Sequence, residues 1–301
     1  KESLSFQLRY GYVPGNNSIY QGIFKLDPGS YLELQIKNND VSLVNTKKYW
    51  SFLDNVKDKQ YNLFKGSEDE AVQKIESKLK KTIQRQMITD VPIGAFLSGG
   101  IDSSLIASLM QSQSGNPINT FTIGFDNAFY NEANYAKKIA NYLGTNHTEH
   151  YVSPQETLDI IPRLPFIYDE PFGDSSQLPT YILSSLAKSK VKVALSGDGA
   201  DEIFGGYNRY FLTNSIWNII KFLPQKIRFL LLKFILSIPT SLWDKIFYWL
   251  SSIIGKQNAY SLPGDKIHKL ALILESKSSK EIYLNLLSQW ETSEKIVLNI
   301  D

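Results

Sequence analysis

Short runs of alternating or β-branched residues, separated by turns, fill the start of the chain. The runs that predict strands are Leu4–Arg9, Tyr31–Ile36 and Val41–Val44. Turn-forming residues separate them, for example Asp27-Pro28-Gly29 and Asn38-Asn39-Asp40. The polar stretch Asp54–Lys65 follows, and its composition predicts a linker.

A helical period then replaces the alternation. Ser67 and Glu70 have the spacing of a capping box, in which each side chain bonds the other residue's backbone. The apolar residues beyond them recur every three or four positions, which predicts one buried helix face. They are Val72, Ile75, Leu79, Ile83 and Met87.

Further along, short apolar strands alternate with amphipathic helices. The predicted strands are Ile93–Leu97, Thr120–Phe125, His147–Val152 and Val191–Leu195. The predicted helices are Ser103–Gln113, Glu132–Leu143 and Leu178–Lys188. This alternation predicts an α/β fold, a doubly wound parallel sheet with flanking helices. Since ligands of such sheets bind beyond the carboxyl ends of the strands, three loops are of interest: Ser98–Ser104, Asp126–Asn131 and Ser196–Gly206.

The most apolar stretch, Ile216–Ile254, is interrupted by prolines and charged residues. Its longest uncharged piece, Phe234–Trp243, has ten residues, whereas a membrane-spanning helix needs about 20. We therefore expect a pair or trio of amphipathic core helices and no membrane partner. A basic amphipathic helix that lies on a membrane surface is the alternative.

Composition narrows the chemistry. The chain has 301 residues, no cysteine and three histidines. This excludes disulfides, a cysteine zinc site, an iron–sulfur cluster and a thiol nucleophile. The net charge of +2 gives no reason to expect a nucleic-acid partner. His147 and His150 lie three residues apart in a predicted strand and so point to opposite faces, which makes them poor joint metal ligands.

The first of the three loops has the features of an anion site. Its paired glycines, Gly99 and Gly100, let the backbone approach a ligand closely. The backbone N–H groups at the start of the next helix, together with nearby hydroxyls, suit a phosphate. The loop has no lysine, so it is not a γ-phosphate-transferring Walker A loop. Asp102 fits beside phosphate if a divalent cation lies between them. The alternative is a tight turn in which Asp102 is only a helix cap.

The last loop carries three carboxylates within five residues, Asp198, Asp201 and Glu202. Like charges so close raise one another's pKa unless a cation offsets them, and oxygen ligands suit Mg²⁺. A structural loop or capping acids would explain the same residues. The acids in Tyr168–Ser176 similarly fit either a site or a capped helix start.

These loops carry a specific resemblance. The segment from Ser98 to Ser103 resembles the pyrophosphate-binding loop of the ATP-pyrophosphatase superfamily. Together with Ser196–Glu202 and Phe204-Gly205-Gly206-Tyr207, it is similar to the class B, glutamine-hydrolysing asparagine synthetases. Asp169-Glu170-Pro171 and Leu26–Gly29 also fit that family. The resemblance implies an adenine nucleotide alpha hydrolase-like fold in a cytoplasmic ligase that uses ATP and Mg²⁺.

The resemblance also implies roles for individual residues. Aspartate would be adenylylated to β-aspartyl-AMP with release of pyrophosphate, and ammonia from glutamine would then give asparagine and AMP. Catalytic roles would fall to Asp198, Asp201 and Glu202, and metal binding to Asp102 and Asp198. The residues that would bind ATP are Leu97, Ser98, Gly99, Gly100, Asp102, Ser103, Ser104, Ile123, Ser196 and Gly197.

Departures from the family pattern shape the expected organisation. The family's glutaminase half begins with a nucleophilic cysteine, which this chain lacks. We expect residues 1–62 to be the short β remnant of a glutamine amidotransferase domain plus a linker, and residues 63–301 to be a synthetase domain truncated at its C-terminus. Such a piece would lack glutaminase activity. A homodimer is what the family suggests.

Other functions remain open at this stage. Relatives amidate sugars or close β-lactam and peptide rings, and Asp198 stands where asparagine synthetases often have glutamate. A tRNA-modifying enzyme with a pyrophosphate loop would need a basic surface and usually cysteines. A non-catalytic nucleotide-binding protein would bind ATP without supporting exchange with pyrophosphate.

Overall fold

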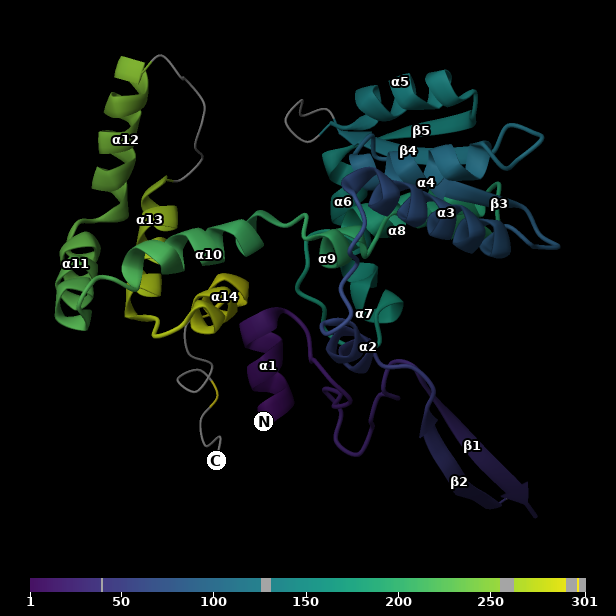
Figure 1. Ribbon diagram of the computed structural model, residues 1–301, viewed down its shortest axis with the longest axis horizontal. Coiled ribbons are helices and arrows are strands. Elements are labelled where there is room, and N and C mark those ends of the chain that lie inside the picture. The colour runs from purple at the N-terminus through teal and green to yellow at the C-terminus, as the bar shows by residue number, and fades with distance from the viewer. Residues whose placement is uncertain (39, 126–130, 255–262, 291–296, 298–301) are drawn as a thin grey trace. The chain divides into compact units, whose positions relative to one another are not determined.

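The structure, a computed structural model, describes residues 1–38, 40–125, 131–254, 263–290 and 297 (Figure 1). The chain divides into two compact units, Lys1–Ala200, to which the described residue Val297 also belongs, and Asp201–Glu291. The first unit contains a parallel sheet and the second is helical. From the sequence we expect a boundary after residue 62, between the remnant of a glutamine amidotransferase domain and the synthetase domain. This boundary stays a prediction.

Four parallel strands form the sheet of the first unit, in the order β5-β4-β3-β6. They are β3 (Ile93–Phe96), β4 (Asn119–Phe125), β5 (Asn146–Val152) and β6 (Val193–Leu195). Ala95 of β3 lies opposite Thr120 on one side and Leu195 on the other. The chain therefore runs outward from β3 to β5 and returns to the other side of β3. This confirms the expected parallel α/β sheet.

Helices cover both faces of this sheet, because alternate residues of each strand point to opposite sides. On one face Ala95 and Leu97 pack with Ile83, Met110 and Ala136, which belong to three helices: α3 (Glu68–Gln86), α4 (Ile101–Gln111) and α5 (Ala133–Leu143). On the other face Phe121 packs with Ala187. The elements between β5 and β6 are α6 (Pro154–Ile160), the 3₁₀ turn η1 (Ile161–Arg163), α7 (Leu164–Ile167) and α8 (Gln177–Lys188).

The capping box predicted before α3 is confirmed. Ser67 Oγ accepts a hydrogen bond from the N–H of Glu70, and Glu70 Oε2 accepts one from the N–H of Ser67 at 3.0 Å. Gly144, at φ 70°, ends α5 in the left-handed conformation that favours glycine.

The start of the chain differs in part from the prediction. Two strands are confirmed as the antiparallel hairpin of β1 (Ser30–Lys37) and β2 (Asp40–Lys48). The strand predicted over Leu4–Arg9 is wrong, because this segment lies in helix α1 (Glu2–Tyr10). Phe6 and Tyr10, one helical turn apart, stack with ring centroids 6.3 Å apart, and Gly11 ends the helix at φ 81°. Over so few residues, the apolar positions fit the two-residue period of a strand and also the period of a helix.

The linker predicted over Asp54–Lys65 is only partly correct. Helix α2 (Phe52–Lys59) occupies its first half. Ser51 caps this helix by accepting a hydrogen bond from the N–H of Asp54 at 3.3 Å. Phe52, Leu53 and Val56 have helical spacing, but the helix has only eight residues and none of them is buried, so the periodic signal is short.

The elements described in the second unit are all helical, starting with the short α9 (Ala200–Phe204), whose first residue belongs to the first unit. Three longer helices then cover the apolar stretch as expected: α10 (Asn208–Ile220), α11 (Gln225–Ser237) and α12 (Thr240–Ile254). The unit ends with α13 (Pro263–Leu272), the turn η2 (Ile273–Glu275) and α14 (Ser279–Leu287). Its core centres on Ile220, Ile273 and Ile282. In the described part of the chain, no helix is long and apolar enough to cross a bilayer.

Candidate active site

The strand order places two of the predicted loops next to each other. The chain leaves the sheet in one direction from β3 and returns on the opposite side at β6. The loops that follow β3 and β6 therefore flank the point where the strand order reverses. In open α/β sheets this point is where ligands bind.

The first loop wraps tightly onto the start of α4. Gly99 has φ +88°, and a Cβ there would lie 2.7 Å from Tyr135 Cβ of α5, so the backbone packs directly on that helix. Ser103 Oγ accepts a hydrogen bond from the N–H of Ser98 at 3.2 Å and lies 2.9 Å from Ser98 Oγ. Ser104 Oγ donates to the carbonyl of Gly100 at 2.6 Å. The predicted residues thus form one hydrogen-bonded turn.

Gly100, the N-cap of α4, has no side chain to cap the helix. The N–H groups of the first helical turn are therefore open to an anion, which the helix dipole favours. Asp102 lies in this turn and is half-buried.

The second loop touches the first through a glycine. A Cβ on Gly197 would lie 2.8 Å from Ser103 N and 2.9 Å from Asp102 Cβ, so the two backbones are in contact. Ser196 Oγ donates to Asp198 Oδ2 at 2.9 Å, which holds the carboxylate over its own loop. Asp198 itself is exposed. The sequence predicted only that the segments Ser98–Ser104 and Ser196–Asp198 each follow a strand. The structure shows that the two segments are in contact.

Asp102 and Asp198 suit a Mg²⁺ ion that is also held by phosphate. Mg²⁺ commonly takes one or two carboxylates and completes its shell with phosphate oxygens and water. Among the described residues no group of three or more His, Asp and Glu side chains could hold a metal by itself. The carboxylates of Asp102 and Asp198 fit an ion that phosphate oxygens also hold, and their binding of Mg²⁺ stays a prediction.

The two residues expected beside adenosine lie deeper. Leu97 is 1% exposed and belongs to the core on the α3–α5 face. Ile123 is half-buried against the cluster around Val152. Both side chains pack in the core, and their contact with adenosine stays a prediction. In the loop expected to follow β4, residues 126–130 lie outside the described residues.

Asp201 and Glu202 belong to the second unit. The backbone of Gly206 folds against Asp201, donating its N–H to the Asp201 carbonyl at 3.0 Å. Tyr207 donates its hydroxyl proton to Glu202 Oε1 at 2.7 Å. This hydrogen bond to the carboxylate, aided by partial burial, raises the pKa of Tyr207 to about 12. No role was assigned to Tyr207 from the sequence, where it appeared only as the last residue of a motif. The feature that could have pointed to it is a tyrosine hydroxyl five residues after Glu202.

Glu170, in the third acidic segment, is held by the start of the chain. Lys25 Nζ lies 2.6 Å from Glu170 Oε2, and the N–H of Ile19 donates to Oε1 at 2.5 Å. Partial burial raises the pKa of Glu170, but the hydrogen bonds and charge of Lys25, with the Ile19 bond, outweigh it. The pKa therefore lies below its usual value. Asp174 accepts the N–H of Ser176 at 2.8 Å, as a turn or cap residue does.

The two histidines of β5 have separate structural partners. His147 Nδ1 lies 2.9 Å from Thr120 Oγ1, and burial lowers the pKa of the ring. His150 Nε2 lies 2.9 Å from Glu156 Oε1. The partners of the two rings in the structure are thus different side chains, Thr120 for His147 and Glu156 for His150.

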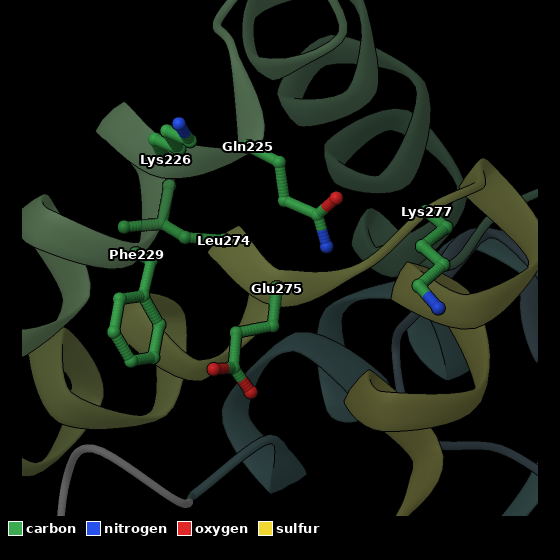
Figure 2. Close-up of a pocket in the computed structure, with 6 residues that line it drawn as sticks. All are labelled: Gln225, Lys226, Phe229, Leu274, Glu275 and Lys277. Atoms are coloured by element: carbon green, nitrogen blue, oxygen red, sulfur yellow. The ribbon is translucent and has the colours of Figure 1, made fainter.

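A pocket in the second unit contains none of the predicted residues (Figure 2). It lies between the start of α11 and η2 and is lined by Gln225, Lys226, Phe229, Leu274, Glu275 and Lys277. The basic side chains share it with the carboxylate of Glu275, so it has no single charge preference.

The fold is a parallel α/β sheet covered by helices, and the loops after β3 and β6 are in contact beyond the carboxyl ends of these strands. Residues 74–296 match the family model described as asparagine synthase. The chain belongs to the asparagine synthase family.

Curated relatives agree with this family. A putative asparagine synthetase [glutamine-hydrolyzing] 2 of Methanocaldococcus jannaschii is 34% identical over 231 residues, which cover 76% of this chain and 42% of the relative. Asparagine synthetase [glutamine-hydrolyzing] 1 of Bacillus subtilis is 34% identical over 210 residues, which cover 70% of this chain and 31% of the relative. The chain thus spans less than half the length of these relatives. Among solved structures, an NH3-dependent NAD synthetase from Campylobacter jejuni aligns with a TM-score of 0.33 and 20% identity, over 45% of this chain and 60% of that chain.

Proposed function

We propose that this chain is the ATP-using part of a ligase that converts aspartate to asparagine. A carboxylate oxygen of aspartate attacks the α-phosphorus of ATP, and the bond to the bridging oxygen breaks and releases pyrophosphate. Ammonia then attacks the acyl carbon of β-aspartyl-AMP, and AMP leaves. The ammonia is released from glutamine elsewhere in the full-length protein.

The contact between Gly197 and the Asp102–Ser103 turn carries this proposal. It joins an anion-binding helix start to a second loop that holds a carboxylate. The N–H groups of α4 and the hydroxyls of Ser98, Ser103 and Ser104 would hold the β- and γ-phosphates, which leave together as pyrophosphate. Asp102 and Asp198 would hold Mg²⁺, which supplies positive charge that offsets the charge of the leaving group.

Asp198 has a second role in the proposal. Its carboxylate would accept a proton from ammonia as the amide bond forms, or stabilise the positive charge on nitrogen. Asp201 and Glu202 would help to bind the ammonium group of the substrate or would order the site. Family membership and the relatives' names support aspartate as the acid.

The test is exchange of labelled pyrophosphate into ATP by the full-length protein. Exchange that requires both aspartate and Mg²⁺ is the expected result. Asp102→Asn should reduce exchange by at least about 100-fold, on the scale of losing one charge stabiliser of a transition state. Asp198→Asn should reduce asparagine formation more than ATP binding. Unchanged exchange in Asp102→Asn would contradict the metal-binding role.

A second acceptor acid is the competing function. Asp198 stands where asparagine synthetases often have glutamate, and a shorter side chain leaves more room at the acceptor. No exchange with aspartate, but exchange with a sugar acid or another carboxylate, would establish this alternative. Tight ATP binding without exchange with any acid would indicate a non-catalytic relative.

A further inference from the structure

Helix α11 exposes an apolar row in addition to the one it buries. Its packed side carries Arg228, Leu232 and Ile235, spaced by four and three. Its outward side carries Ile227, Leu230, Leu231 and Phe234, which have the same helical spacing and are 45%, 65%, 40% and 62% exposed. Both sides of α11 are therefore apolar, and only one is covered by the described part of the second unit.

Helix α12 repeats this arrangement. Leu242, Ile246 and Trp249 are spaced by four and three and are 46%, 40% and 65% exposed. The neighbouring Trp243 instead faces α11 and donates its indole N–H to the Ile235 carbonyl at 3.2 Å. Both helices pack against α13, as can be followed in Figure 1. We call the seven outward side chains of α11 and α12 the apolar rows.

Basic residues accompany the apolar rows. From Asn208 to Ile254 the only acidic residue is Asp244, and it accepts a hydrogen bond from the N–H of Gly264 at 2.9 Å. The same segment has six basic residues: Arg209, Lys221, Lys226, Arg228, Lys233 and Lys245. Lys226, Lys233 and Lys245 are exposed beside the rows. The rows are thus apolar and partly aromatic, with an excess of basic residues beside them, although Lys226 also shares a pocket with Glu275.

We propose that the apolar rows of α11 and α12 bind the surface of an anionic lipid bilayer. Apolar side chains leave water by entering the boundary of the acyl chains, which is favourable by roughly 25 cal/mol per Å². Lysines at the edge of a helix reach the lipid phosphates while their methylene stems stay on the apolar layer. Prolines 224 and 239 separate short helices that lie along a surface rather than cross it.

Charge selects lipid over a second copy of the chain. Two copies that met through the apolar rows would bring like charges together, which is unfavourable. An anionic bilayer offers the complementary charge and has no fixed shape to match. This proposal goes beyond amide formation and differs from the expectation of no membrane partner.

The test is flotation of the full-length protein with lipid vesicles. Binding is expected to vesicles of phosphatidylcholine and phosphatidylglycerol in equal parts, and to weaken as salt is raised. Lys226→Ala with Lys233→Ala should lower the partition coefficient about 30-fold, at the usual contribution of a basic residue near an anionic surface. Lys78→Ala with Lys81→Ala, exposed lysines of α3, is the matched control and should change little.

A second pair of variants tests the apolar contribution. Phe234→Ser should weaken binding at least about tenfold, because an inserted aromatic ring returns to water. Phe166→Ser is the control, because Phe166 is 92% exposed in α7 of the first unit. Pyrophosphate exchange should be the same in all four variants, so failure of this proposal is separable from failure of the proposed function.

Three results would overturn the lipid-binding proposal. The first is absence of binding to anionic vesicles. The second is equal binding of Phe234→Ser and the native protein. The third is strong protection of α11 from hydrogen exchange at Leu230 and Phe234 before lipid is added, together with a dimer that Phe234→Ser dissociates, since a second copy would then cover the rows.

Discussion

Gly197 determines how closely the two loops of the candidate site approach. Its missing side chain lets the backbone after β6 rest on the first turn of α4, where a Cβ would be 2.8 Å from Ser103 N. The neighbours at that point are backbone and Cβ atoms, which cannot rotate away. This glycine is therefore required by tertiary contact and not by its own torsion angles.

Gly197→Ala should push the loops apart. We expect a loss of about 1–3 kcal/mol of stability, as for other small-to-large changes in packed sites, and at least tenfold weaker Mg–ATP binding. Calorimetric titration and denaturant unfolding measure the two effects. Gly115→Ala is the control, because a Cβ at Gly115 meets nothing within 4 Å and should leave both quantities unchanged. Native-like affinity in Gly197→Ala would refute the contact's role.

Tyr207 reports on the charge of Glu202. The carboxylate accepts the phenol's proton in a hydrogen bond and repels the phenolate, which is why the pKa of Tyr207 rises from 10.0 to about 12. Glu202→Gln should return the pKa towards 10.0. A titration followed by NMR of labelled tyrosine, with Tyr207→Phe to assign the signal, measures it. Asp201→Asn should cause a smaller fall, and an equal fall would mean that overall charge dominates.

At the scale of elements, one ion pair fastens the start of the chain to the α/β unit. Glu170 follows α7, whereas Lys25 and Ile19 come from the loop between α1 and β1. Lys25 also donates to the Val13 carbonyl at 2.8 Å, which holds the loop closed on itself. The acidic segment that sequence alone offered as a possible site is thus used, at Glu170, for docking.

This ion pair predicts an acid-sensitive contribution to stability. The pKa of Glu170 is lowered on folding, so the unfolded chain binds more protons and stability falls as pH falls. The contribution is present above the ordinary carboxyl pKa of 4.5 and is lost as the pH drops through the lower folded value. Glu170→Gln should cost about 1–3 kcal/mol at neutral pH and little in strong acid.

Denaturant unfolding over a series of pH values measures this difference. Asp169→Asn, at an exposed neighbour, should follow the native profile throughout. A difference between native protein and Glu170→Gln that does not shrink in acid would show that the carboxylate charge is not what fastens the loop.

On the scale of the whole molecule, the strands differ sharply in burial, and β3 and β4 are the most buried of them. Ala95, Thr120 and Phe121 of β3 and β4 are fully buried. Every residue of β2 and nearly every residue of β1 is exposed. An isolated two-stranded hairpin is only marginally stable in water.

Hydrogen exchange should therefore rank the strands. Amides of β3 and β4 should exchange only through global unfolding, and those of β1 and β2 through local opening at low free energy. Native-state exchange of the chain at increasing denaturant measures both. Equal protection of the hairpin and the central strands would contradict this ranking.

Local chemistry was enough to predict much of the fold. The Ser67–Glu70 capping box, the helical period and the later strands act over a few residues and were confirmed, whereas the strand predicted over Leu4–Arg9 was wrong. Local chemistry was insufficient for α1, where the same short apolar pattern fits a strand or a helix. It also missed α2, which buries no residue.

The identity of the two chemical loops was readable from the chain, because glycines, hydroxyls and carboxylates after an apolar strand are a local signal. Which loops meet was decided by the strand order, since only the return of β6 to the other side of β3 brings Gly197 onto Asp102. The pairing of Glu170 with Lys25 needed the same long-range folding. The helical period of α11 predicts apolar rows but not which row is buried. Packing against α13 determines which row stays exposed to solvent.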